Sequence, residues 1–169
     1  MEESEVISKL NISFLNGRVI DVYHVAVDPK TGVVHEQDMD FQLENGTIIN
    51  ISDNDLGCKK EDIGKDKQIK MITAFRRSIE ICRSDNPVIG IFPTPDDPDN
   101  SPIICGIIRK IVEPSEEKYK RFERYATLDV GIGQLLLVLF KDHKEDFSFF
   151  HEGDCVWIKG GGLTLWQVI

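Results

Sequence analysis

The stretch from Ile103 to Val112, IICGIIRKIV, carries the strongest fold signal in this sequence of 169 residues. It is rich in β-branched residues and contains one glycine, Gly106, which predicts a β-strand that is crowded or strongly coiled at that position. Four further runs of strand character follow, separated by turns or charged segments. These are residues 125–130 (YATLDV), 134–140 (QLLLVLF), 153–159 (GDCVWIK) and 163–169 (LTLWQVI). The C-terminal part of the chain therefore predicts five short strands.

Five short strands in this order are typical of an oligonucleotide-binding (OB) barrel, a partly open Greek key. The Gly-Asp pair at residues 153–154 supports this interpretation, because such a pair recurs before the fourth strand of these barrels. Alternation along the fourth run predicts that Val156 and Ile158 face the interior. Trp157 and Lys159 are then predicted to face outward. The alternative is another small β-barrel of the SH3-like type.

A helix is predicted immediately before these strands, over residues 66–83. Apolar side chains fall at helical spacing along it, at Ile72, Phe75, Ile79 and Cys82. They would form one stripe that packs against the barrel.

The first part of the chain has β character of its own. Residues 18–27 (RVIDVYHVAV) predict a strand, and Asn45-Gly46 predicts a hairpin turn because this dipeptide tolerates positive φ. A lone hairpin is barely stable in water, so we expect this part to pack against the helix or the barrel. The predicted fold class is mostly β with one main helix. It comprises an N-terminal β-rich extension over residues 1–65, followed by the helix and a five-stranded OB-type Greek-key barrel over residues 66–169.

Charge and composition narrow the function. Lys and Arg number 20 against 29 Asp and Glu, and the net charge of -9 excludes a protein that coats nucleic acid through bulk positive charge. No apolar run is long enough for a transmembrane helix, so no membrane partner is expected.

The cysteines form no Cys-x-x-Cys pair, which predicts free thiols and no metal site; they are Cys58, Cys82, Cys105 and Cys155. Because no catalytic motif is present, we predict a non-enzymatic protein without a cofactor.

Basic and aromatic side chains alternate in and beside the loop that follows the first of the five strands. Cations can hold the phosphates of a single strand, and aromatic rings can stack on its bases. The predicted nucleic-acid-binding residues are Arg109, Lys110, Lys118, Tyr119, Lys120, Arg121, Phe122, Arg124 and Tyr125. Glutamates in the same segment dilute the charge, and the alternative is a solvated loop whose rings pack onto the barrel. An outward Trp157, with Lys159 near it, predicts a protein interface.

Several segments together resemble a known family. They are NPVIGIF at residues 86–92, the proline-rich loop at 93–102, IICGIIRKIV, YATLDVGIG at 125–133 and EGDCVWIKG at 152–160. This pattern, over residues 68–169, is similar to that of Stn-type OB subunits of telomere-capping (CST) complexes and of the related middle subunit of replication protein A. One departure is the loop before the last strand. It is only three glycines, whereas this loop often grips nucleic acid in the family.

Two functions follow from these observations. The resemblance implies a telomere-end protection protein of the nucleus, located at telomeric chromatin. It would bind single-stranded DNA and other telomere-capping subunits, among them a second OB-fold protein. The alternative is an OB-type protein–protein scaffold without nucleic-acid binding of its own, which the net negative charge and the short glycine loop favour.

Overall fold

Most of the chain folds into β-strands. The structure is a computed structural model that describes residues 8–74, 78–96, 101–113, 123–140, 150–160 and 162–169. The strands are β1 (Leu15–Val27), β2 (Val34–Leu43), β3 (Ile48–Ser52), β4 (Asp66–Ala74), β5 (Ser78–Ile81), β6 (Gly90–Phe92), β7 (Ile103–Val112), β8 (Glu123–Asp129), β9 (Gln134–Phe140), β10 (Cys155–Lys159) and β11 (Thr164–Val168). A short 3-10 helix, η1 (Lys60–Asp62), and a helical turn at residues 8–10 are also present. Within the described ranges, no helix has the length and apolar character that crossing a membrane requires.

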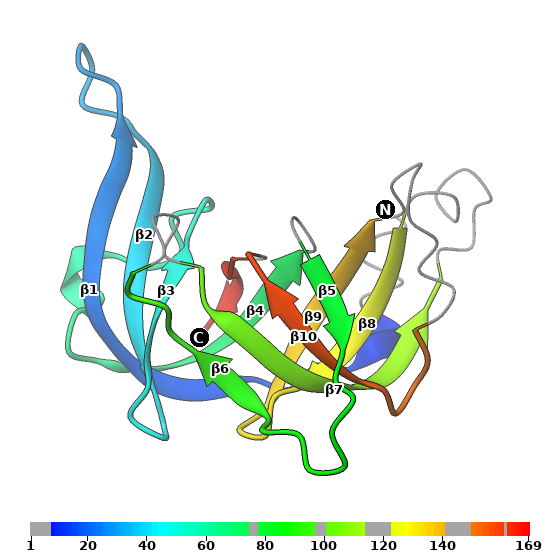
Figure 1. Cartoon of the computed structure of the whole chain (residues 1–169). Helices are drawn as coiled ribbons and strands as arrows, with labels where there is room; N and C mark the ends of the chain where they lie inside the picture. Colours follow the sequence, from blue (N-terminus) through cyan, green and yellow to red (C-terminus); the bar gives the residue numbers. More distant parts are fainter. Residues whose placement is uncertain (1–7, 75–77, 97–100, 114–122, 141–149, 161) are drawn as a thin grey trace.

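Five strands close into a barrel in the order β1–β2–β3–β11–β4 (Figure 1). The ring closes because β4 also pairs with β1, where Ile69 lies opposite Leu15. Its pairings are antiparallel except for that of β3 with β11, where Thr164 lies opposite Ser52. With β11 as the fifth strand, this is the strand order of an OB barrel. The predicted fold class, mostly β with a five-stranded OB-type barrel, is therefore confirmed.

The members of this barrel differ from those predicted over residues 103–169. All five predicted runs form strands, which are β7, β8, β9, β10 and β11. Of these five, only β11 belongs to the closed barrel. Three of its other strands, β1, β2 and β3, come from the part predicted as an extension, and β4 comes from the segment predicted as a helix. The difference arises because β11 pairs with β3 and β4 and not with β10. Strand patterns locate strands along the chain, but they do not specify which strands pair.

The remaining strands form a second, open sheet, inserted in the chain between β4 and β11. We call it the second ring, although β4 and β5 at its two ends are not paired with each other in the described residues. Its pairings run β4–β9–β8–β7–β10–β5, and β6 adds to the edge of β7. β4 therefore pairs in both rings, and β5 follows it in the chain at the far edge of the second ring. In Figure 1, β1, β2 and β3 lie on the left, and β5, β7, β8, β9 and β10 lie on the right.

The helix predicted over residues 66–83 is wrong, because this segment forms β4 and β5. In β4, Ile69, Met71 and Thr73 are completely buried, which is the alternation of a strand. β4 pairs with β1, β9 and β11, and these non-local ladders override the weak helical preference of the segment.

One apolar core is continuous through both rings. It joins Phe41 and Met71 of the barrel to Leu128 of the second ring, and all three are completely buried. Gly106 faces this core, where an added Cβ would lie 2.7 Å from Cγ of Leu128 and 2.8 Å from the backbone oxygen of Asp129. The predicted crowding at Gly106 is therefore confirmed, and the continuous core makes the two rings one packed unit.

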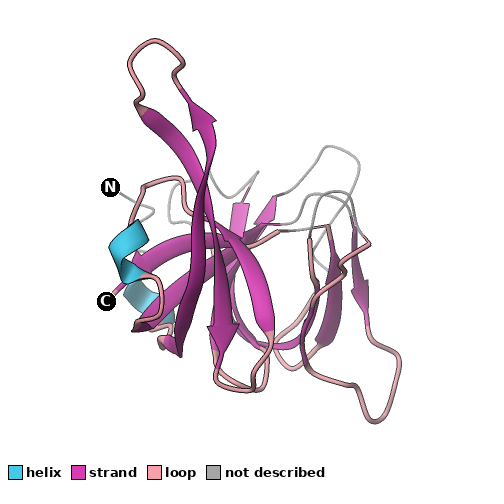
Figure 2. Ribbon diagram, turned by 90° about the vertical axis from the view of Figure 1, so that its left-hand side faces the viewer, coloured by secondary structure: helices cyan, strands magenta, loops and turns pink. Residues whose placement is uncertain are grey.

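The hairpin of β1 and β2 extends well beyond the barrel (Figure 2). Over residues 24–36, the described strands pair only with each other, and we call this segment the β1–β2 arm. Three apolar side chains on it are exposed, namely Val25, Val27 and Val33. Asp28 closes the turn at the tip, because its carboxylate accepts hydrogen bonds from two backbone N–H groups.

Candidate functional site

The outward sides of β6, β7, β10 and β5 form one face of the second ring. Trp157 of β10 lies between Cys105 of β7 and Glu80 of β5, and Cys105 also lies opposite Gly90 of β6. Because side chains alternate along each strand, these neighbours lie on the same face. We call this face the Trp157 surface. Its outward side chains include Glu80, Phe92, Cys105, Cys155, Trp157 and Lys159.

Trp157 is a large exposed side chain at the centre of this surface. Its exposed fraction is 40%, whereas Val156 and Ile158 on either side of it in β10 are completely buried. The predicted orientation of these three residues is therefore confirmed. Lys159, which also faces outward, holds its Nζ 6.0 Å from the centroid of the Trp157 ring, at the limit of a cation–π contact.

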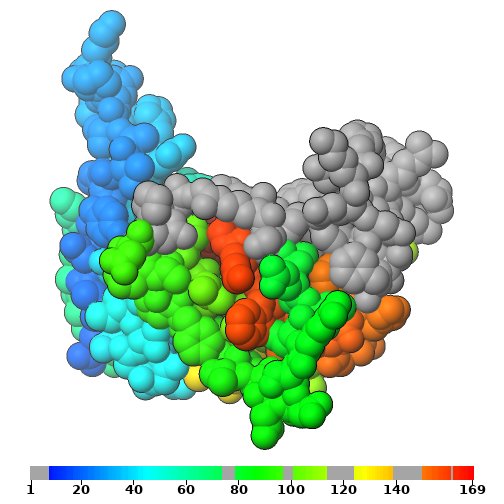
Figure 3. Space-filling view, viewed as in Figure 1, coloured from blue at the N-terminus to red at the C-terminus, as the bar shows by residue number. Residues whose placement is uncertain are grey.

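Phe92 adds a second exposed ring to the Trp157 surface, with an exposed fraction of 38%. Its ring lies beside Gly90, where an added Cβ would come within 3.1 Å of Cζ. Phe92 and Trp157 therefore lie on opposite sides of Cys105 on one face. Figure 3 shows this side of the molecule, with β10 in orange-red between green segments of the chain. The sequence signal for Phe92 was the short apolar run VIGIF before Pro93, which the prediction of site residues did not use.

The predicted DNA-binding residues of β7 are exposed but already engaged. Arg109 donates hydrogen bonds to the carboxylate of Asp129, at 3.1 Å from Nε and 3.0 Å from Nη2. Lys110 donates from Nζ to the backbone oxygen of Lys9 at 2.7 Å. Because Arg has five N–H donors and Lys has three, a DNA phosphate would share each side chain with the partner that it already has.

The predicted DNA-binding residues at the start of β8 are covered. Arg124 forms an ion pair with Glu113 at 2.9 Å, and its side chain is only 16% exposed. Tyr125 is 3% exposed, because it belongs to a small apolar cluster with Leu10 and Ile12 of the N-terminal segment. This burial corrects the predicted stacking role, since Tyr125 has no exposed face for a base. Lys118, Tyr119, Lys120, Arg121 and Phe122 lie outside the described residues.

The outward face of β2, on the barrel, is acidic. Glu36, Asp38 and Asp40 alternate there with buried side chains. Burial and the two neighbouring carboxylates raise the pKa of Asp38. Burial and the charge of Asp40 also raise the pKa of Tyr23 to about 12, and the Tyr23 hydroxyl hydrogen-bonds to Oδ1 of Asp40 at 3.3 Å. Carboxylates that disfavour one another's charge also repel phosphate, so this face does not suit DNA.

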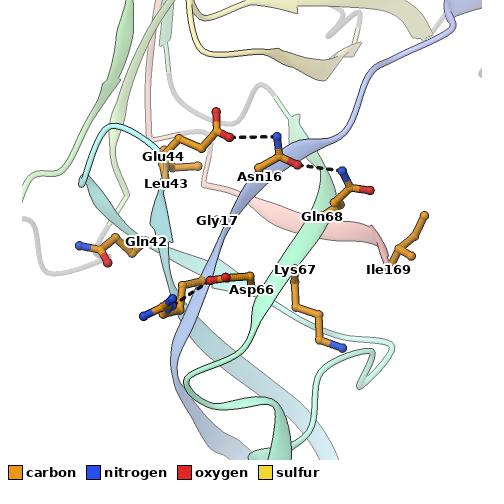
Figure 4. Close-up of a pocket in the computed structure, with 10 residues that line it drawn as sticks. Asn16, Gly17, Gln42, Leu43, Glu44, Asp66, Lys67, Gln68 and Ile169 are labelled. Atoms are coloured by element: carbon orange, nitrogen blue, oxygen red, sulfur yellow. Dashed lines mark hydrogen bonds and ion pairs between the residues drawn. The ribbon is translucent and has the colours of Figure 1, made fainter.

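A groove of about 490 Å³ lies outside the barrel, beside the part of β1 that pairs with β2 on one side and with β4 on the other (Figure 4). Most of the residues that line it are polar, among them Asn16, Arg18, Gln42, Glu44, Asp66 and Gln68. Asn16 donates to Glu44 at 3.0 Å and accepts from Gln68 at 2.9 Å, while Arg18 pairs with Asp66 at 2.8 Å. These side chains are exposed and bonded to one another, whereas tight small-molecule sites are mostly apolar and enclosed. The groove is therefore a weaker candidate than the Trp157 surface.

In the described parts of the chain, no cluster of three metal-ligating side chains is arranged to hold a metal ion.

The strand order and the continuous core place the chain in the class of OB-type β-barrel proteins, a class that includes many binding modules. No family model and no curated protein matches the sequence. Among solved structures, the chain is similar to the cytoplasmic molybdate-binding protein ModG with molybdate bound. The TM-score is 0.43 and the sequence identity 14%, over 90% of this chain and 93% of that chain. Similarity at this level is too low to transfer a function.

Proposed function

We propose that the protein is a non-enzymatic OB-type binding protein that contacts a partner protein through the Trp157 surface. The observation that carries this proposal is Trp157 itself, which is 40% exposed on a sheet face with the exposed ring of Phe92 across Cys105. Tryptophan is enriched among the residues that dominate binding energy at protein interfaces. Its apolar area is in contact with water here, and a partner that covers it gains the free energy of burying that area.

The charge distribution supports a protein as the main ligand in preference to DNA. The net charge is -9, and the described basic residues of the predicted DNA site already have partners within the chain. On the Trp157 surface itself, the acidic Glu80 and the basic Lys159 lie in neighbouring strands around the aromatic ring. A mixed polar rim around an aromatic centre is typical of a protein interface.

Trp157→Ala tests this proposal. Partners captured by the full chain are identified and purified, and their affinity is then measured for each variant. We expect Trp157→Ala to keep the wild-type unfolding transition and to weaken binding by about 30-fold or more, the effect of losing a hot spot of about 2 kcal/mol. Val25→Ala is the matched control, because Val25 is an exposed apolar residue on the β1–β2 arm.

Two outcomes would contradict the proposal. If Trp157→Ala bound the purified partner as tightly as the wild-type chain, the Trp157 surface would not be part of the interface. An equal loss in Val25→Ala would show that the effect is not specific to this surface.

Single-stranded DNA is the second candidate ligand, and the proximity of Lys159 to the Trp157 ring favours it. A ring for base stacking beside a cation for phosphate is the combination that such sites use. Binding of a labelled oligonucleotide is measured at two salt concentrations, because phosphate contacts make affinity fall with salt. Joint replacement of Lys118, Lys120 and Arg121 by Ala should reduce the logarithmic salt slope by roughly 0.7 for each lost contact. If the wild-type chain did not bind the oligonucleotide at low salt, single-stranded DNA would be excluded as its ligand.

The telomere-capping role is the most specific form of the proposal. It rests on the sequence resemblance over residues 68–169, a region that supplies only β4 and β11 of the closed barrel. In this form, the partner is another telomere-capping subunit with an OB fold, and the protein acts in the nucleus. Imaging of the tagged chain against a marker of chromosome ends tests this version, and a distribution unrelated to those ends would contradict it.

A further inference from the structure

Three cysteines that are far apart in the sequence come together on the Trp157 surface. Cys82 directly follows β5 and lies opposite Cys155, because Ile81 pairs with Val156 in the preceding position. The backbone N–H of Cys82 donates to the oxygen of Cys155 at 2.8 Å, and their side chains are hydrogen-bonded to each other. Cys105 lies diagonally from Cys155, opposite Trp157.

The positions of Cys82 and Cys155 suit a disulfide. Directly opposite residues in an antiparallel pair have Cα atoms about 4.5–5.5 Å apart, which falls within the range of roughly 4.4–6.8 Å that disulfides span. A diagonal pair such as Cys105 and Cys155 is typically about 7–8 Å apart, beyond the usual limit. Cys82 and Cys155 are also partly exposed, whereas Cys58 and Cys105 are buried.

We propose that Cys82 and Cys155 form a thiol–disulfide exchange site, at which a low-molecular-weight disulfide such as glutathione disulfide converts the two thiols into a cross-strand disulfide. The new bond would tie the end of β5 to the start of β10, next to Trp157. The inference does not depend on whether the Trp157 surface binds a partner.

The exchange proceeds in two balanced steps. The thiolate of one cysteine attacks a sulfur of the reagent, forming a mixed disulfide and releasing one reagent thiolate. The thiolate of the other cysteine then attacks the protein sulfur of the mixed disulfide, forming the Cys82–Cys155 bond and releasing the second reagent thiolate. Two protein thiols are oxidised and one reagent disulfide is reduced to two thiols, which take up the two protons that the cysteines lose.

Protonation should limit the rate of this exchange. Burial and the neighbouring Cys155 raise the pKa of the Cys82 thiol to about 12. Because the thiolate is the nucleophile, exchange should be slow at neutral pH and should accelerate as the pH rises.

The test is incubation of the folded full chain with glutathione disulfide at about pH 9, where more thiolate is present, followed by mass spectrometry. We expect the mass to fall by two hydrogens, two of the four thiols to disappear, and digestion to yield a peptide that links Cys82 to Cys155. Cys82→Ser and Cys155→Ser should each stop at a mixed disulfide that retains one glutathione. Cys58→Ser and Cys105→Ser are the matched controls and should form the disulfide like the wild-type chain.

Three results would overturn the proposal. The first is a stable glutathione adduct on the wild-type chain without a cross-linked peptide. The second is a link that involves Cys58 or Cys105. The third is no reaction at this pH while a denatured sample reacts fully, which would show that the native pair is inaccessible.

Discussion

Asp53 is a carboxylate in the interior, completely buried in the loop after β3. Its Oδ1 accepts a hydrogen bond from the N–H of Gly57 at 2.8 Å. Its Oδ2 accepts from the N–H of Cys58 at 2.8 Å and from the Gln37 amide at 2.7 Å. The same amide donates to the backbone oxygen of Cys58 at 2.6 Å, so two polar side chains fasten this loop to β2.

Asp53→Ala should lower the free energy of unfolding by roughly 2–4 kcal/mol, because it removes the acceptor of three hydrogen bonds, two of which are buried. Urea denaturation of the full chain measures the change. Asp55→Ala is the control from the same loop, since Asp55 is exposed and should change stability by less than about 0.5 kcal/mol. Similar losses in both variants would mean that the hydrogen bonds of Asp53 carry no special stabilisation.

At the scale of elements, the β1–β2 arm differs from the rest of the sheet. Its strands have no third strand beside them in the described chain, and Val25, Val27 and Val33 remain exposed. A two-stranded ribbon of this kind is marginally stable by itself in water. The arm therefore needs the barrel in order to remain folded, whereas it contributes little to the free energy of unfolding of the barrel.

Shortening the arm tests this relation. Deletion of residues 25–27 together with 34–36, which keeps the turn around Asp28, should change the free energy of unfolding by less than about 0.5 kcal/mol, the range of surface changes. Thermal and urea unfolding of the shortened chain give the value. A loss of several kcal/mol would show that the arm packs against another part of the protein.

At the scale of the whole molecule, the two rings share β4 and one core. A fragment of residues 66–169 corresponds to the barrel predicted from the sequence, and it lacks β1, β2 and β3. It leaves β4 without β1 and β11 without β3, and it exposes buried side chains such as Met71 and Leu165. We expect the second ring to depend on the barrel for its stability.

The fragment of residues 66–169 should therefore show no cooperative thermal transition, whereas the full chain shows one. Circular dichroism of both, at equal concentration, makes the comparison. A fragment that unfolds cooperatively with native-like strand content would establish that the second ring folds independently of the barrel.

Local features of the sequence were sufficient to predict much of this protein. The five C-terminal strands, the Asn45-Gly46 turn with its positive φ at Gly46, the crowding at Gly106 and the outward Trp157 were all predicted, because alternation and turn chemistry act over a few residues. Pairing over long distances was decided only by the tertiary structure. In the tertiary structure, β11 pairs with β3 and β4, and the segment predicted as a helix forms two strands. Tyr125 packs against Leu10 and Ile12, and Cys82 lies opposite Cys155. The physical reason is that the free energy of these arrangements comes from hydrogen-bond ladders and burial between segments that are remote in the chain, which no local pattern records.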